Sequence, residues 1–177
     1  MSAPTVLVLM GVSGVGKTTV GQHLAACLGW AFADADALHP PENVAKMQRG
    51  EGLTDADRAP WLRAVRTLID ECIAAELPTV LACSALKRAY RDQLRRDDDC
   101  VAVVWLDAPH AALAERLARR PGHFAGPDLL PSQFAALEPP SPSEAVRVRS
   151  EGCAEDTAWE IVKMLGLRHG PRARHCP

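Results

Sequence analysis

The chain has 177 residues, of which 47% are hydrophobic and 24% charged, and its formal net charge is −2. A chain of this length buries roughly 70% of its unfolded surface when it folds and needs only one domain. The near-neutral charge provides no electrostatic attraction to nucleic acid or to an anionic membrane, so neither is expected as a partner. The longest apolar stretches, TVLVLM at 5–10 and VAVVWL at 101–106, have the length of strands and are too short to span a bilayer.

The cysteines are scattered through the chain without any CxxC pair. They fall in apolar patterns typical of helices or strands, which predicts buried, reduced thiols and argues against a zinc site or a disulfide framework. The six are Cys27, Cys72, Cys83, Cys100, Cys153 and Cys176. The first residues, MSAPT, lack the basic region of a signal peptide. A reducing, cytoplasmic location is therefore expected.

Hydrophobic periodicity and Gly/Pro punctuation divide the chain into alternating strands and helices. The predicted strands lie at 5–10, 30–32, 79–83, 101–106 and 146–148. The predicted helices lie at 17–28, about 42–49, from Thr54 to before Pro78, at 87–96, from Pro109, from Pro131 to about 137, and at about 154–166.

Short apolar strands separated by helices predict a three-layer α/β fold, in which a parallel sheet of about five strands is flanked by helices. Residues 1–167 are expected to form this single domain, with a short lid at about 116–128. The basic segment 168–177 is expected to be a disordered tail. Ligands of such folds bind beyond the carboxyl ends of the strands.

The stretch GVSGVGKT at 11–18 follows the first strand and opens a helix. It fits the phosphate-binding pattern G-x-x-x-x-G-K-[ST], in which backbone N–H groups hold the phosphates of a nucleotide. Lys17 is expected to reach the β and γ phosphates, and the Thr18 hydroxyl to ligate Mg²⁺. The predicted ATP-binding residues are Gly11, Val12, Ser13, Gly14, Val15, Gly16, Lys17, Thr18 and Thr19. The alternative is a glycine-rich turn with an incidental Lys-Thr pair.

Several classes of protein share this phosphate loop, so the residues that would bind the second ligand must identify the class. A switch GTPase is disfavoured, because the guanine-binding motif Asn-Lys-x-Asp is missing from the sequence. The only asparagine, Asn43, is followed by valine. Phosphoryl transfer to an alcohol needs a carboxylate for the hydroxyl proton and cations for the developing charge. Asp34 and Asp36 are candidate carboxylates, which point the same way if the strand geometry persists. The alternative for them is a turn or a helix cap.

The candidate cations lie in RLARRPGHFAGPD at 116–128, between Pro and Gly residues that suit a mobile lid. They are Arg116, Arg119, Arg120 and His123. A solvated helix end remains the alternative for Arg116 and Arg119.

Four further blocks give a specific resemblance when taken in order with the phosphate loop. They are FADADALHPPENVAKMQRGEGLTDADRAPWL at 32–62, ACSALKRAYRDQLR at 82–95, RLARRPGHF at 116–124 and LLPSQFAALEPP at 129–140. Together they resemble the gluconokinases of the small P-loop type. The resemblance implies a nucleoside-monophosphate-kinase-like fold and a homodimer. It also implies phosphorylation of D-gluconate at its 6-hydroxyl, with ATP and Mg²⁺, to give 6-phosphogluconate.

The family pattern places Asp36 and His39 at the substrate pocket, with Asp36 as the base that orients the hydroxyl. It assigns Arg58 and Lys87 to the sugar-acid carboxylate or to the transferred phosphoryl group. Arg120 and His123 match the R-x-G-H-F of its lid, so His123 is expected to bind substrate. Lys17 and Arg120 are expected to stabilise the transition-state charge.

Several alternatives stay open for the basic residues. Arg58 could pair with Asp55 or Asp57, and Lys87 could be a plain basic helix start, although a lysine there opposes the helix dipole. Arg91 and Arg95, one turn apart, are predicted to form a solvated face.

The chain departs from the family pattern at Ala35, Gly52 and Ala125, where glycine, proline and a bulky residue are usual. The match fades after residue 140, so no adenine-contacting residue is predicted there. Two other functions remain possible: a kinase of the same fold acting on shikimate or adenylylsulfate, and a nucleotide-sensing protein without catalysis.

Overall fold

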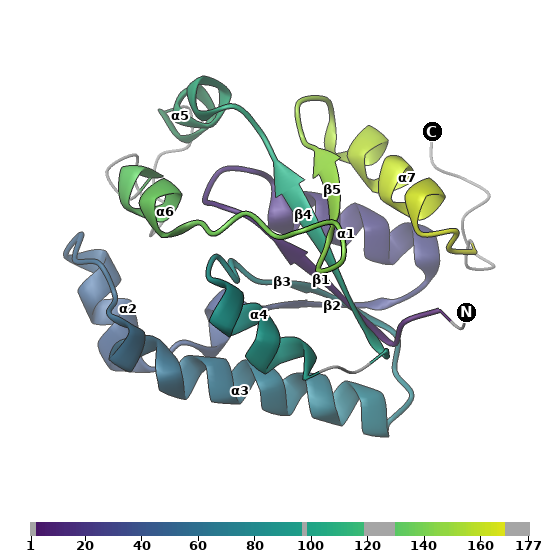
Figure 1. Cartoon of the computed structure of the whole chain (residues 1–177), viewed down its shortest axis with the longest axis horizontal. Helices are drawn as coiled ribbons and strands as arrows, with labels where there is room; N and C mark the ends of the chain where they lie inside the picture. Colours follow the sequence, from purple (N-terminus) through teal and green to yellow (C-terminus); the bar gives the residue numbers. More distant parts are fainter. Residues whose placement is uncertain (1–2, 97–98, 119–129, 169–177) are drawn as a thin grey trace.

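The computed structural model describes residues 3–96, 99–118 and 130–168. Five strands form one parallel sheet in the order β2-β3-β1-β4-β5 (Figure 1). The strands are β1 (Val6–Met10), β2 (Ala31–Asp34), β3 (Thr79–Ala82), β4 (Val101–Asp107) and β5 (Val146–Arg149). The predicted number of strands and their parallel pairing are confirmed.

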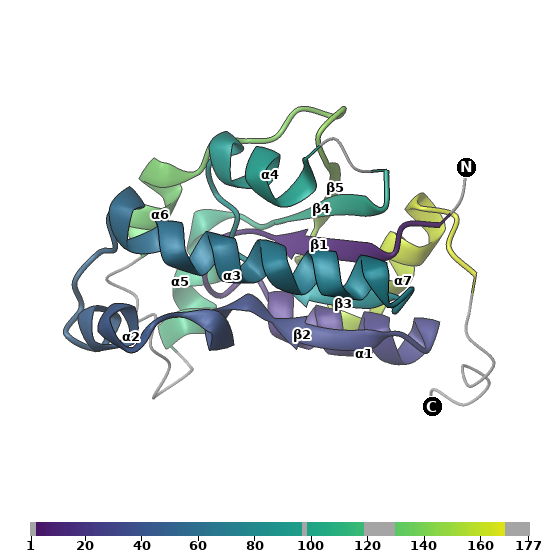
Figure 2. The ribbon, with the colours of Figure 1, turned by 90° about the horizontal axis from the view of Figure 1, so that it is seen from below.

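The helices alternate with these strands along the chain, as the sequence predicts. They are α1 (Lys17–Leu28), α2 (Pro41–Gln48), α3 (Asp55–Ala74), α4 (Arg88–Arg95), α5 (His110–Ala118), α6 (Leu130–Ala136) and α7 (Ala154–Met164), with a short 3₁₀ helix η1 (Ala35–Leu38). Helices α1 and α7 cover one face of the sheet, and α3 and α4 cover the other (Figures 1 and 2). Among the described residues, no helix is both long and apolar enough to cross a membrane.

Strand β1 shows why the sheet is covered on both faces. Its side chains alternate, so that Leu7 and Leu9 join the core under α1 and α7, whereas Val8 and Met10 join the core under α3. All five of its residues are buried. A central parallel strand must therefore be apolar throughout, which explains the unbroken run VLVLM.

The strand order brings the predicted site segments to one edge of the sheet. Strands β2, β3 and β1 are neighbours and parallel, so their carboxyl ends lie side by side. Asp34 ends β2, Ser84 follows β3, and the loop 11–16 follows β1. The Gly11 N–H donates to the Ser84 carbonyl over 3.2 Å, which ties two of these ends together.

The path after β2 differs from the prediction. The extended strand stops at Asp34, because the Asp34 carboxylate accepts the Asp36 N–H over 3.1 Å and starts η1. The expectation that Asp34 and Asp36 share one side of a continuing strand is therefore wrong. The alternative, a cap, is the correct one for Asp34.

Arg91 also differs from the prediction of a solvated face. Its side chain is buried and donates to the carbonyls of Ala85 and Leu86 over 3.3 Å and 3.0 Å. It also pairs with Glu144 over 3.2 Å. The cause is that the buried face of α4 includes this position as well as Leu94.

The predicted burial of the cysteines is confirmed at Cys72 and Cys83 and is wrong at Cys153. Cys72 and Cys83 are buried, Cys27 and Cys100 are partly buried, and none of the five described cysteines forms a disulfide. Cys153 is exposed, because it starts α7 and its sulfur accepts the Asp156 N–H over 3.3 Å. Cys176 lies outside the described residues.

Candidate active site

The phosphate loop between β1 and α1 depends on glycine at the positions where its backbone is left-handed. Gly11 has φ 146°, and a Cβ there would lie 2.6 Å from the Leu106 carbonyl oxygen. Gly14 has φ 81°, and its Cβ would lie 2.9 Å from Leu117 Cγ of α5. Both positions therefore combine a turn that L-residues avoid with a close neighbour that leaves no room for a side chain.

Lys17 folds back over this loop. Its Nζ donates to the carbonyls of Gly11 and Val12 over 3.0 Å and 3.1 Å. Burial lowers the pKa of Lys17, and the carboxylates of Asp36 and Asp34 act in the opposite direction. An anion at this point would further favour the charged ammonium.

Thr18 meets a carboxylate from the neighbouring strand. Its hydroxyl donates to Asp34 Oδ2 over 2.9 Å, while Asp34 Oδ1 caps η1. A hydroxyl beside a carboxylate is an oxygen pair of the kind that Mg²⁺ prefers. The described residues contain no cluster of three or more His, Cys, Asp or Glu side chains that could hold a metal ion.

Asp36 lies on η1 near Lys17, and His39 follows at the end of η1. Asp36 is exposed, and its charge acts on the pKa of both Lys17 and His39. Burial lowers the pKa of His39; Asp36 opposes this effect and Arg58 reinforces it. The three predicted substrate residues Asp36, His39 and Arg58 are therefore close enough to influence one another.

A polar framework holds η1 against α2 and α3. The His39 ring stacks on Trp61, with ring centroids 4.5 Å apart and an interplanar angle of 9°. The Trp61 indole N–H donates to the Ala35 carbonyl over 2.7 Å. Asn43, which is buried, donates to the Asp57 carbonyl over 2.8 Å and lies 3.4 Å from His39 Nδ1. This framework fixes the His39 ring.

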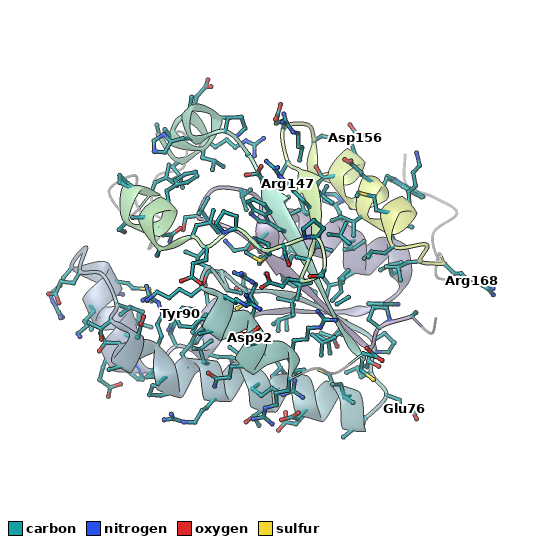
Figure 3. The ribbon with its side chains drawn as sticks, viewed as in Figure 1. Glu76, Tyr90, Asp92, Arg147, Asp156 and Arg168 are labelled. Atoms are coloured by element: carbon teal, nitrogen blue, oxygen red, sulfur yellow. The ribbon has the colours of Figure 1, made fainter. Side chains whose placement is uncertain are left out.

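Lys87 and Arg58 share one carboxylate, that of Asp55 at the start of α3. Lys87 Nζ lies 2.7 Å from both Asp55 oxygens. The hydroxyl of Tyr90, which is labelled on α4 in Figure 3, lies 2.5 Å from Asp55 Oδ1. Arg58 Nη1 lies 4.0 Å from Asp55 and donates to the Leu53 carbonyl over 2.6 Å. Asp55 explains how a lysine is tolerated at the N-cap of α4. The sequence predicts no role for Asp55 beyond a possible pairing with Arg58.

A pocket of about 330 Å³ adjoins the phosphate loop. Its walls come from the loop, α1, α5 and the segment after β5. They are Gly14, Val15, Gly16, Thr19, Val20, Arg116, Ser150, Gly152 and Ala154. Ser150 is buried and donates to the Val15 carbonyl over 2.8 Å, which joins the segment after β5 to the loop. Sequence reasoning missed Ser150, Gly152 and Ala154, because no motif marks these small residues.

The predicted lid is only partly within the described residues. Arg116 belongs to α5 and lines the pocket. Arg119, Arg120, His123 and Ala125 lie outside the described residues, as does most of the segment 116–128.

The chain is similar to known kinases over most of its length. A family model described as shikimate kinase matches residues 13–130. A gluconokinase of Gluconobacter oxydans (strain 621H) is 52% identical over 161 residues, which are 90% of each chain. The crystal structure of a sugar kinase from Janibacter sp. HTCC2649 is 40% identical, with a TM-score of 0.85 over 98% of this chain and 100% of that one. A gluconokinase structure from Sinorhizobium meliloti 1021 is 42% identical, with a TM-score of 0.82 over 94% of both chains. The chain thus belongs to the gluconokinase family and has the fold of the shikimate kinase-type P-loop kinases.

Proposed function

We propose that the protein transfers the γ-phosphoryl group of ATP to the 6-hydroxyl of D-gluconate, giving 6-phospho-D-gluconate and ADP. The observation that carries the proposal is the position of Asp36. Its carboxylate lies within electrostatic reach of both Lys17 of the phosphate loop and His39 of the acceptor side. A base between a phosphate site and a polyol site is the arrangement that phosphoryl transfer to an alcohol requires.

The nucleotide side is assigned to the phosphate loop and the adjoining pocket. The loop N–H groups and Lys17 hold the triphosphate, and the nucleoside occupies the pocket beside Arg116 and Ser150. The volume of this pocket lies within the usual range for small-ligand sites. Thr18, together with the Asp34 carboxylate bonded to it, is the group that would hold Mg²⁺. Bound Mg²⁺ supplies positive charge that neutralises the phosphates.

The acceptor side is assigned to the residues around η1 and α3. Asp36 accepts the proton of the gluconate 6-hydroxyl, whose oxygen bonds to the γ phosphorus while the bond to the β–γ bridging oxygen breaks. His39, held neutral by burial, is placed to hydrogen-bond the polyol. Arg58 and Lys87 are assigned to the gluconate carboxylate, Arg120 to the charge on the γ-phosphoryl group, and His123 to substrate binding.

A coupled assay of ADP release tests the function, with gluconate, shikimate and adenylylsulfate as acceptors. We expect turnover with gluconate. Asp36→Asn should lower kcat by roughly 10²- to 10⁴-fold, the usual contribution of a general base, while the KM for ATP changes little. Asp92→Asn is the matched control, because Asp92 is an exposed carboxylate on α4 (Figure 3). Among the described residues it forms one long ion pair, with Arg88 at 3.8 Å.

Three results would contradict the proposal in different ways. Turnover with shikimate or adenylylsulfate but not with gluconate would indicate another kinase of this fold. ATP binding without turnover on any acceptor would indicate a nucleotide sensor. Equal kcat values for Asp36→Asn and Asp92→Asn would remove Asp36 from the reaction.

A further inference from the structure

Gln133 of α6 makes a two-point contact with the middle of the phosphate loop. Its Oε1 accepts the Ser13 N–H over 2.6 Å, and its Nε2 donates to the Ser13 hydroxyl over 2.9 Å. The two residues are 120 positions apart, and the contact is partly buried. A carboxamide is suited to this task, because it offers one acceptor and two donors without charge.

The helices that flank this contact are fixed to the core and to each other. Leu130 of α6 is buried in the core, and Phe134 lies 5.0 Å from the His110 ring of α5. Leu117 of α5 packs so closely on Gly14 that a Cβ there would lie 2.9 Å away. Two helices therefore press on consecutive residues of the loop, Ser13 through Gln133 and Gly14 through Leu117.

The backbone N–H groups of the loop fall into two sets. The first set has protein acceptors: Gly11 donates to Ser84, Ser13 to Gln133, and Val15 to Val12 over 3.4 Å. The second set, Val12, Gly14, Gly16, Lys17 and Thr18, donates no hydrogen bond within the described part of the chain. Lys17 and Thr18 begin α1, where the N–H groups have no intrahelical partner. Phosphate oxygens are the natural acceptors for this second set.

We propose that Gln133 is a positioning residue for nucleotide binding. By holding the Ser13 peptide and hydroxyl, it fixes the curvature at which the N–H groups of Gly14 and Gly16 converge on the phosphates. It does not touch the reacting atoms; it acts through the loop. The inference rests on the proposed use of ATP and adds to it a residue outside the phosphate-loop motif.

The test compares Gln133→Ala and Gln133→Glu with the full-length wild-type chain. MgATP affinity is measured by titration calorimetry without acceptor, and kcat and both KM values by coupled assay with gluconate. Gln22→Ala is the matched control, because Gln22 is an exposed glutamine within α1. Melting temperatures are recorded for every variant.

We expect Gln133→Ala to weaken MgATP binding roughly tenfold, the effect of losing two neutral hydrogen bonds, while the KM for gluconate and the melting temperature stay close to wild type. Gln133→Glu can still accept the Ser13 N–H, but its charge repels the phosphates. Its MgATP affinity should therefore fall at least as far below wild type as that of Gln133→Ala.

Two results would overturn the inference while leaving the proposed function intact. One is MgATP affinity in Gln133→Ala equal to that of Gln22→Ala. The other is a parallel loss of ATP affinity, gluconate affinity and melting temperature, which would mean that Gln133 only supports the fold. If the wild type turns gluconate over and the Gln133 variants bind MgATP as tightly as it does, the positioning role is wrong and the proposed function stands. A wild-type chain that binds no MgATP would overturn both proposals.

Discussion

His39 shows how the surroundings of one side chain determine its charge. The ring is partly buried against Trp61, and this burial lowers its pKa. Arg58 acts in the same direction and Asp36 against it. A neutral ring can both donate and accept hydrogen bonds, which suits a group that lies beside the Asn43 amide and that is proposed to bind the hydroxyls of the substrate.

This shift predicts a pH-dependent stability. Because the unfolded chain binds a proton at His39 at a higher pH than the folded chain does, the free energy of unfolding should fall as the pH drops from about 6.5 through the lower, folded pKa. His39→Phe keeps a ring on Trp61 but cannot titrate. Urea unfolding between pH 7.5 and 5 should show the wild type losing stability relative to this variant. A constant difference across that range would mean that His39 titrates as it does in the unfolded chain.

At the same scale, the sequence predicts contacts within a motif better than contacts across the fold. The phosphate loop could be recognised because its residues are contiguous. The pairing of Thr18 with Asp34 could not, since it depends on the strand end that lies beside α1. Gln133 and Ser13 are farther apart still, and no local pattern marks a glutamine in a short helix as the partner of a loop.

At the scale of elements, the first turn of α3 contributes both to the stability of the fold and to the proposed gluconate site. The Thr54 hydroxyl accepts the Asp57 N–H over 3.2 Å, and the Asp57 carboxylate accepts the Thr54 N–H over 2.8 Å. Lys46 of α2 binds the same carboxylate over 2.8 Å. Asp55 and Arg58 lie in the turn that this capping box fixes.

Removing the cap should therefore affect both folding and substrate binding. Thr54→Ala should cost about 1 kcal/mol of unfolding free energy and raise the KM for gluconate more than the KM for ATP. Thr67→Ala is the control, because Thr67 lies within the same helix and its hydroxyl only bonds to the Arg63 carbonyl one turn earlier. Denaturant unfolding and steady-state kinetics would check both values. If the two KM values rose together, α3 would have no particular link to the acceptor.

Local sequence patterns predict the helices and strands, with the exception of the 3₁₀ helix η1. Apolar runs bounded by Gly, Pro and Asp predict all five strands to within a few residues. The 3₁₀ helix η1 was not predicted, because it is created by a side chain: the Asp34 carboxylate takes the Asp36 N–H that a longer strand would use. The prediction that Arg91 is solvated was also wrong, because a guanidinium can be buried when backbone carbonyls and the Glu144 carboxylate accept its hydrogen bonds.

At the scale of the whole molecule, one sheet separates two cores. Leu24 of α1 and Ile69 of α3 are fully buried, one in each core. The two helices lie on opposite faces of the sheet (Figures 1 and 2). The loop 11–16 and the neighbouring strand ends gather at the edge that both layers share. In the proposed function, a ligand at this edge contacts elements of each layer, with Lys17 and part of the pocket on α1, and Arg58 on α3.

This arrangement predicts that the two layers unfold together. Leu24→Ala and Ile69→Ala should each cost about 2–5 kcal/mol, and because the residues share no contacts, the double variant should show their sum to within about 0.5 kcal/mol. Leu77→Ala is the control, since Leu77 is 49% exposed and should change the unfolding free energy far less. Urea unfolding followed by tryptophan fluorescence and by circular dichroism should give one transition for every variant.

Saturating MgATP should stabilise both single variants by the same amount, because a ligand that binds only the folded domain acts on every part of a cooperative unit. Separate transitions for the two faces would instead mean that the sheet does not couple its layers.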